Sequence, residues 1–259
     1  MELNGSPITE AELAALGLVG FGHFTSMRVE DRAVRGLTQH MDRLTRDCRT
    51  VFDAELDTER VRELVRQALP DTADAFVVRV TIYDPAIPLG NPGADADPKI
   101  LVTFRAAPPA NLGPMTLQSA VYTRDLAKTK HIGLFGSLYQ RRLAQRAGVD
   151  DVLFTAADGT ISEIATSNIG VIIDGRLTWP QADVLPGITM RLLSQTLDTD
   201  IAVNPITLAQ LPHVDGAIAT NAAVGVRAIS RIDDIDLPVD DNLIAKLRAE
   251  YESIPAVRI

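Results

Sequence analysis

The sequence predicts an α+β fold in two domains, and three observations support this. Segments with apolar residues at helical spacing alternate with short runs rich in Val, Ile and Phe. The stretch 107–114 concentrates proline and glycine between two strand-like segments, which is typical of an interdomain linker. A length of 259 residues allows one large domain or two of ordinary size. We therefore expect an N-terminal domain over residues 1–110 and a C-terminal domain over residues 111–259.

Two helices and two strands are expected before this linker. Leu37–Phe52 and Thr58–Ala68 carry apolar residues at helical spacing with charged faces between them. Phe76–Tyr83 and Ile100–Arg105 are short and rich in Val, Ile and Phe, which favours strands. Residues 84–98 hold four prolines and two glycines, so we expect a long surface loop, a type that is often functional.

After the linker the pattern predicts short strands with helices interposed. Asp158-Gly159 and Asp174-Gly175 have the composition of hairpin turns. The expected strands are Val152–Ala156, Ile169–Ile173 and Leu177–Trp179, and the expected helices are Leu138–Ala147, 186–196 and Leu243–Tyr251.

Charge and composition exclude several classes of function. The formal net charge of −9 repels phosphate backbones and anionic lipid, and the basic residues are scattered, so we expect no nucleic-acid partner. No apolar run approaches the roughly 18 residues of a membrane span, so we expect no membrane partner and a cytoplasmic location. Cys48 is the only cysteine, which rules out an internal disulfide and a cysteine-based zinc site, and no metal is expected.

The segment 162–191 carries the most informative pattern. A Glu is followed five residues later by an Asn, then by an apolar strand, a Gly turn and a Leu-Pro-Gly-Ile-Thr step into a helix. This ordered pattern resembles the signature region of the fold-type IV enzymes that use pyridoxal phosphate (PLP), the class IV aminotransferase family. The matching residues are Glu163, Asn168, 169–173, Gly175, 178–180 and 185–189.

The resemblance extends over most of the chain. Residues 20–29 are similar to the family's N-terminal strand, 40–44 to its His-x-x-Arg-Leu helix, and 220–226 to a late loop. It implies a small N-terminal α/β domain and a larger C-terminal domain with a barrel-like sheet that carries the Schiff-base lysine. It also implies PLP in the cleft between the domains, and a homodimer whose partner completes the pocket.

The family's Schiff-base lysine lies some thirty residues before the signature Glu, at the end of a strand and ahead of a helix, and Lys130 fits that place. Lys128 is the close competitor. A lysine that bonds to an aldehyde must lose its proton, and burial beside other cations depresses an ammonium pKa. The alternative for Lys130 is an ordinary solvated lysine.

The resemblance assigns the remaining cofactor contacts residue by residue. Glu163 would meet the PLP ring nitrogen, since a carboxylate keeps that nitrogen protonated. Arg43 and the helix start at Ile188 and Thr189 would bind the phosphate, with Asn221 as a further donor. The alternatives are an exposed strand or turn residue for Glu163, a surface arginine for Arg43 and a common turn residue for Asn221.

Two departures from the family pattern leave the substrate open. Phe135 stands where many members have a tyrosine that meets the cofactor's phenolic oxygen. Tyr83-Asp84 stands where the family often has an Arg-Gly step near the substrate carboxylate. His23, Arg28 and Arg105 are conceivable carboxylate or hydroxyl partners, and surface or strand-edge roles for them are equally open.

The resemblance implies an aminotransferase that moves an amino group between an amino acid and a 2-oxo acid through a Schiff base on Lys130. The runner-up is a lyase of the 4-amino-4-deoxychorismate type that releases pyruvate. A catalytically silent PLP-binding homologue and an unrelated α/β binding domain are the remaining alternatives. Substrate handedness stays open.

Overall fold

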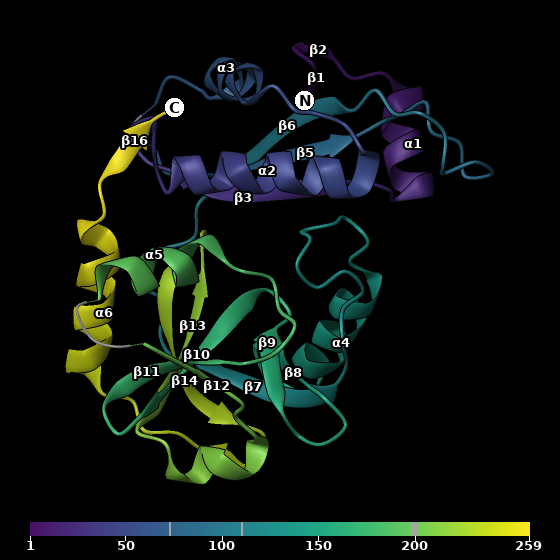
Figure 1. The fold of residues 1–259 in the computed structure, drawn as a ribbon. Helices are drawn as coiled ribbons and strands as arrows, with labels where there is room; N and C mark the ends of the chain where they lie inside the picture. Colours follow the sequence, from purple (N-terminus) through teal and green to yellow (C-terminus); the bar gives the residue numbers. More distant parts are fainter. Residues whose placement is uncertain (73, 110, 198–200) are drawn as a thin grey trace. The chain divides into compact units, whose positions relative to one another are not determined.

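The computed structural model describes residues 1–72, 74–109, 111–197 and 201–259 (Figure 1). It divides into two compact units. Unit 1 comprises Met1–Ala107, Thr129–Gly133 and Ala256–Ile259, and unit 2 comprises Pro108–Lys128 and Leu134–Pro255. Lys130 thus packs with unit 1, whereas the sequence analysis assigned it to the C-terminal domain. Ala110, at the expected boundary, lies outside the described residues, and the division into domains 1–110 and 111–259 stays a prediction.

Unit 1 is built on an antiparallel sheet in the order β2-β1-β6-β5-β3. Its strands are β1 (Glu2–Leu3), β2 (Ser6–Pro7), β3 (His23–Val29), β5 (Phe76–Tyr83) and β6 (Lys99–Ala106), and β4 (Ala33–Arg35) pairs with β16 (Ala256–Arg258). Its helices are α1 (Glu10–Val19), α2 (Leu37–Phe52) and α3 (Thr58–Ala68).

The two faces of this sheet differ. Val78, Val80 and Ile82 of β5 belong to one apolar core with buried residues of α2 and α3. Because side chains alternate along a strand, Arg79 and Thr81 must lie on the opposite face. On that face Tyr83 packs with Leu3 and Leu101 in a smaller apolar cluster, against which Leu16 of α1 lies.

Helix α1 was not predicted, although the sequence contains its end signals. Thr9 and Glu12 form a capping box, and Gly20 closes the helix in a left-handed conformation with φ of 63°. The apolar residues of α1 show little amphipathic pattern, which is why its periodicity gave no signal.

Unit 2 contains a barrel-like sheet, as the resemblance implied. Among the described residues, six strands close a ring in the order β10-β13-β14-β7-β8-β9 and back to β10. The strands of the unit are β7 (Met115–Val121), β8 (Asp151–Thr155), β9 (Ile161–Ile164), β10 (Ser167–Ile173), β11 (Arg176–Pro180), β12 (Ala202–Asn204), β13 (Gly216–Asn221), β14 (Gly225–Ile232) and β15 (Ile235–Asp236).

The barrel interior and exterior are both apolar. Ile169, Val171 and Ala219 belong to the cluster inside the ring, and Ile172 and Ile218 pack outside it with the helices. The helices are α4 (Phe135–Arg146), α5 (Ile188–Thr196), α6 (Asp241–Ser253) and the short η1 (Leu208–His213). Helices α5 and α6 contact β13 and β14 along the outside (Figure 1).

Most predicted elements are confirmed, and the differences concern their ends. The bounds of α2, α3 and β5 agree with the prediction, whereas α4 begins at Phe135 instead of Leu138. The expected loop 220–226 is a tight turn, because β13 runs to Asn221 and β14 begins at Gly225. Within the described ranges, no helix combines the length and the apolar character needed to cross a bilayer.

Candidate active site

Lys130 is fixed against the start of β3 by backbone hydrogen bonds. Phe24 N donates to Lys130 O at 2.8 Å, and Ile132 N donates to Gly22 O at 2.9 Å. Lys130 N in turn donates to a carboxylate oxygen of the buried Asp47 at 3.0 Å. A Cβ on Gly22 would lie 2.5 Å from the backbone oxygen of Ile82, so only glycine allows this close approach. The Lys130 Nζ lies 4.9 Å from the centroid of the Phe24 ring.

Arg43 is buried in the same unit, on the inner side of α2. Its Nη2 donates to Thr25 Oγ1, and His40 Nδ1 lies 2.7 Å from the same hydroxyl. Burial holds the pKa of His40 well below its usual range, and the charges of Arg43 and Lys130 add to the effect. The imidazole is therefore neutral. Arg43 and Lys130 thus both act on the His40 ring.

Exposure separates the predicted residues from their neighbours. Arg43 is 4% exposed, whereas Arg46 and Arg49 lie on the outer side of α2, as expected for surface arginines. The side chain of Lys128 is 77% exposed and pairs with Asp183 at 3.5 Å. These positions favour Lys130 over Lys128 as the functional lysine.

Unit 2 brings three buried polar residues into one row. Glu163 on β9 is paired with Asn168 on β10, and Asn168 is paired with Thr220 on β13. Directly paired residues of neighbouring strands project to the same face. Leu185 ties the row to the chain that leads into α5: its N donates to Glu163 at 3.3 Å, and its O accepts from Asn168 Nδ2 at 2.7 Å.

Arg124 holds the carboxylate of Glu163, and the sequence analysis missed it. Arg124 Nε lies 2.8 Å from Glu163 Oε1, both side chains are 8% exposed, and Arg124 also donates to the carbonyl of Ala127. The guanidinium favours the charged carboxylate in this buried place. No local pattern in the sequence points to Arg124, because it lies in a loop 39 positions before its partner.

The start of α5 offers hydrogen-bond donors that do not bond to other groups among the described residues. Gly187 caps the helix without a side-chain hydrogen bond, so the first-turn N–H groups of Ile188 and Thr189 face outward from the helix end. The hydroxyls of Thr189 and Thr220 are buried and have no hydrogen-bond partner among the described residues. A phosphate would accept from such groups, so this donor set fits the phosphate of PLP.

Gly187 and Asn168 make this arrangement compact. A Cβ on Gly187 would lie only 2.0 Å from Asn168 Oδ1. The helix start can approach the row only because residue 187 has no side chain. Asn168 thus braces the loop that leads into α5 through its hydrogen bond to Leu185 O.

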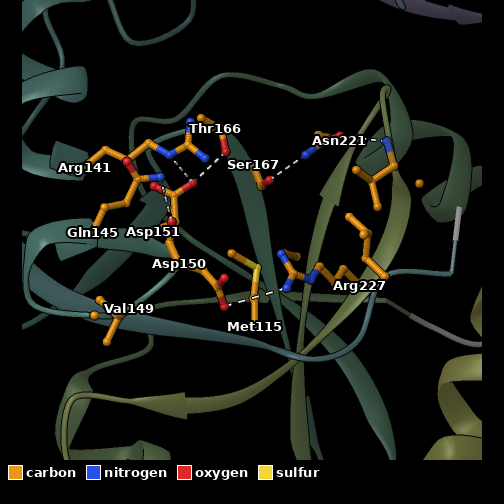
Figure 2. A pocket seen from close by; sticks show the side chains of 15 residues that line it. Met115, Arg141, Gln145, Val149, Asp150, Asp151, Thr166, Ser167, Asn221 and Arg227 are labelled. Carbon is orange, nitrogen blue, oxygen red and sulfur yellow. Dashed lines mark hydrogen bonds and ion pairs between the residues drawn. The ribbon is translucent and has the colours of Figure 1, made fainter. Parts of the chain in front are cut away.

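The side chain of Asn221, which was predicted to donate a hydrogen bond to the phosphate, projects away from the row. As the neighbour of Thr220 on β13 it projects to the opposite face, with Ala219 of the barrel core. Its Nδ2 donates to Ser167 Oγ at 2.9 Å, and its Oδ1 accepts from the N–H groups of Ala223 and Val224 at 3.0 Å. Figure 2 shows Asn221 and Ser167 on the wall of a cavity of about 520 Å³ at the barrel end. The side chain that joins the row is therefore that of Thr220.

The other conceivable substrate partners are placed as follows. His23 is fully buried, and burial followed by the charge of Arg46 lowers its pKa to about 3. Arg28 donates to Glu30 at 2.7 Å, and Arg105 is exposed. Phe135 is 82% exposed at the start of α4. The structure therefore gives none of these residues a contact that assigns it to a substrate.

A profile of the family described as amino-transferase class IV matches residues 22–232. The chain belongs to the class IV aminotransferase family. A branched-chain-amino-acid aminotransferase assigned in Rickettsia typhi is 32% identical over 122 residues, which are 44% of this chain and 42% of that protein. One assigned in Methanocaldococcus jannaschii is 25% identical over 269 positions, covering 92% of this chain and 88% of that protein.

A solved structure shares the fold of this chain. A hypothetical aminotransferase from Mycobacterium tuberculosis in its PLP-bound form superposes with a TM-score of 0.81 at 20% identity. The match covers 95% of this chain and 94% of the other. This likeness confirms the two-part α+β fold with its barrel-like sheet.

Proposed function

We propose that this class IV aminotransferase family member is an active PLP-dependent aminotransferase that moves an amino group between an amino acid and a 2-oxo acid. The observation that carries the proposal is the buried row of Glu163, Asn168 and Thr220 beside the start of α5. It combines a carboxylate held by Arg124 with buried hydroxyls that lack partners. These are the groups that a cofactor with a basic ring nitrogen and a phosphate requires.

Each residue has a defined task in this proposal. Lys130 Nζ holds the aldehyde end of PLP, and Glu163 keeps the ring nitrogen protonated. Ile188 N–H, Thr189 and Thr220 bind the phosphate, and Arg43 supplies a cation for it. Asn221 acts indirectly, because its carbonyl oxygen fixes the 222–224 turn that follows Thr220.

When bound, PLP supplies an aldehyde carbon that takes an amino group and a ring that accepts the electron pair of the broken α-carbon bond. Once the substrate amine has displaced Lys130, its free Nζ would take the proton from the substrate α-carbon and return it as general acid. His40 is neutral, so it adds no charge of its own to those of Arg43 and Lys130. Arg124 keeps Glu163 in the charged form, which is the form that holds a proton on the ring nitrogen.

The relatives favour transamination over the lyase alternative, since those compared above carry aminotransferase names. A branched-chain amino acid is therefore the first donor to test. Given the donor alone, an aminotransferase releases one equivalent of 2-oxo acid per site and stops until a 2-oxo acceptor is added. Given 4-amino-4-deoxychorismate, whose enolpyruvyl group can leave as pyruvate, continuous pyruvate release without an acceptor would instead identify the lyase.

Lys130→Ala tests the covalent assignment. The wild type should bind PLP so that borohydride fixes the cofactor to one lysine, and peptide mass mapping should locate it at position 130. Lys130→Ala should lose this adduct and the activity, whereas Lys128→Ala should keep both. A wild-type protein that forms the adduct but does not transfer an amino group would be the silent PLP-binding homologue, and one that takes up no PLP would overturn the proposal.

Three further expectations of the sequence analysis remain proposals. The chain forms a homodimer, acts in the cytoplasm and has its domain boundary near residue 110. Light scattering after size exclusion measures the assembly, and a single-chain mass would overturn the dimer.

A further inference from the structure

Asp47 is a buried carboxylate on α2 that has no task in the proposed function. Its side chain is 0% exposed, although aspartate is unfavourable inside a helix and a buried carboxylate is costly unless hydrogen bonds satisfy it. One oxygen, Oδ1, accepts from Arg46 Nε at 3.0 Å and from Arg46 Nη2 at 2.7 Å. The other, Oδ2, accepts from the backbone N–H of Lys130 at 3.0 Å. Half of this carboxylate is therefore spent on the functional lysine.

The segment 129–133 is held in unit 1 by hydrogen bonds to β3 and α2. The chain immediately before and after this segment belongs to unit 2. On the side of β3, Phe24 N donates to the carbonyl of Lys130 at 2.8 Å. On the side of α2, the side chain of Asp47 accepts from the N–H of Lys130. A hydrogen bond to a charged acceptor is stronger than one between neutral groups, so Asp47 is an effective anchor for this backbone.

Asp47 and Arg43 lie four positions apart on one face of α2. Residues at this spacing are neighbours on a helix, about 6 Å apart along its axis. Both are buried, and so is His40 on the preceding turn. Burial lowers the pKa of His40, and the charges of Arg43 and Lys130 add to the effect, so both cations act on this face of the helix. One rigid helix thus fixes Lys130 relative to the cation proposed for the phosphate.

The backbone position of Lys130 matters because its side chain is a long, flexible stem. Each rotatable bond adds freedom that is lost when the amine is held against a reacting carbon. A displacement of about 1 Å at a reacting group can cost about 100-fold in rate. A fixed Cα limits the positions that Nζ can take, and the Asp47 hydrogen bond contributes to fixing it.

We propose that Asp47 is a positioning residue for Lys130: its carboxylate fixes the backbone N–H of Lys130 to α2, one helical turn from Arg43. This task rests on the proposed PLP-dependent function, whereas the hydrogen bond itself belongs to the protein alone. Asp47 acts through Lys130 and has no assigned contact with the cofactor. It should therefore affect the bond between Lys130 and the PLP aldehyde, and leave the binding of the phosphate as it is.

Two cofactor probes test the proposal on the full chain. PLP can bond to the Lys130 amine with loss of water, whereas 4'-deoxypyridoxine 5'-phosphate has the same ring and phosphate but no aldehyde. Asp47→Leu should raise the dissociation constant of PLP about 10-fold, since a hydrogen bond to a charged group is lost, and leave that of the analogue unchanged. Asp47→Asn keeps an acceptor oxygen and should lie closer to wild type. Asp42→Leu, on the exposed face of α2, is the matched control.

Amide hydrogen exchange of the cofactor-free protein gives a second measurement. Exchange of the Lys130 N–H should be about 10- to 100-fold faster in Asp47→Leu than in wild type, because this N–H has lost its acceptor. The rate in Asp42→Leu should match that of wild type. An unchanged rate in Asp47→Leu would show that the carboxylate does not anchor Lys130.

The outcomes separate the two proposals. If the wild type transaminates but Asp47→Leu weakens PLP and its analogue equally, or weakens neither, the positioning role is wrong and the function stands. If the wild type bonds PLP at Lys130 without transferring an amino group, and Asp47→Leu weakens PLP alone, the function is wrong and the positioning role stands.

Two further results overturn the positioning role. An Asp47→Asn variant that binds PLP as weakly as Asp47→Leu would mean that the acceptor oxygen does not matter. A wild type that takes up no PLP overturns both proposals. Should Asp47→Leu fail to fold by circular dichroism, Asp47→Ala, which also lacks an acceptor, takes its place in every comparison.

Discussion

At the residue scale, the proposed chemistry depends on charges that the fold buries and then pairs. Glu163 and Arg124 are both 8% exposed and contact each other at 2.8 Å. A buried ion pair adds little net stability, but removal of one partner leaves an isolated charge that is costly to bury. The pair therefore serves to keep Glu163 charged, and its loss should be visible in stability as well as function.

Arg124→Met should lower the free energy of unfolding by about 3 kcal/mol, because it leaves the Glu163 carboxylate buried without its cation. The double variant Arg124→Met/Glu163→Met should recover most of this loss. Urea unfolding of the cofactor-free protein measures both. A single variant as stable as wild type would contradict the role of the pair, and Arg142→Met on the exposed side of α4 is the control.

His23 predicts a pH dependence of stability. Its folded-state pKa of about 3 lies below the ordinary value of 6.5, so protons bind the unfolded chain more tightly. The contribution of neutral His23 to the free energy of unfolding is fully present above pH 6.5. It is lost as the pH falls toward 3, by about 1.4 kcal/mol per pH unit. Between pH 6 and pH 5, the free energy of unfolding of the wild type, measured in urea, should fall by about this 1.4 kcal/mol more than that of His23→Phe. Parallel profiles for the two proteins would show that His23 does not titrate in this way.

At the element scale, strand pairing and helix ends decide which side chains meet. The pairing of β9, β10 and β13 aligns Glu163, Asn168 and Thr220, and the loop before α5 closes over them. A shift of one residue in the register of β13 would replace Thr220 by Asn221. The function of the row thus depends on the register as much as on the residue types.

Gly187→Ala should damage this region specifically. The added Cβ would meet Asn168 Oδ1 at 2.0 Å, so the start of α5 must move away from the row. We expect a loss of about 1–3 kcal/mol in unfolding free energy, as for other overpacked sites, together with weaker PLP binding. Gly90→Ala, where a Cβ would meet nothing within 4 Å, is the control. Unchanged PLP affinity in Gly187→Ala would argue against a phosphate site at α5.

At the scale of the whole molecule, each unit has its own core, and cofactor binding stabilises the folded chain by mass action. Unit 1 is organised around the apolar cluster beneath α2 and α3, and unit 2 around clusters inside and outside the barrel. Neither core needs the polar residues of the candidate site. The site residues are therefore retained at a cost in stability that a ligand can offset.

PLP at about 100 times its dissociation constant should raise the free energy of unfolding by about 2.7 kcal/mol. Pyridoxal at the same concentration should stabilise less, because it lacks the phosphate that Thr189 and Thr220 would hold. Thermal unfolding, monitored by circular dichroism, measures how much each ligand stabilises the folded chain. Equal stabilisation by the two would mean that the phosphate contributes nothing.

The sequence by itself determined the family, the main elements and the residue types of the site. Helical spacing predicted α2 and α3 with their ends, and β-branched runs predicted β5, because these patterns repeat over a few residues. The ordered motif 162–191 predicted Glu163 and the start of α5. Helix α1 was missed for lack of an amphipathic pattern, although its end signals were present.

Only the tertiary structure decided which of these residues meet. It paired Glu163 with Arg124, put Thr220 instead of Asn221 in the row, and laid Arg79 and the Nζ of Lys130 each against the ring of Phe24. These contacts join strands, turns and loops that lie far apart along the chain, and their geometry depends on strand register. A local pattern predicts on which side of a helix or strand a residue lies. It does not predict which distant residue will contact that side.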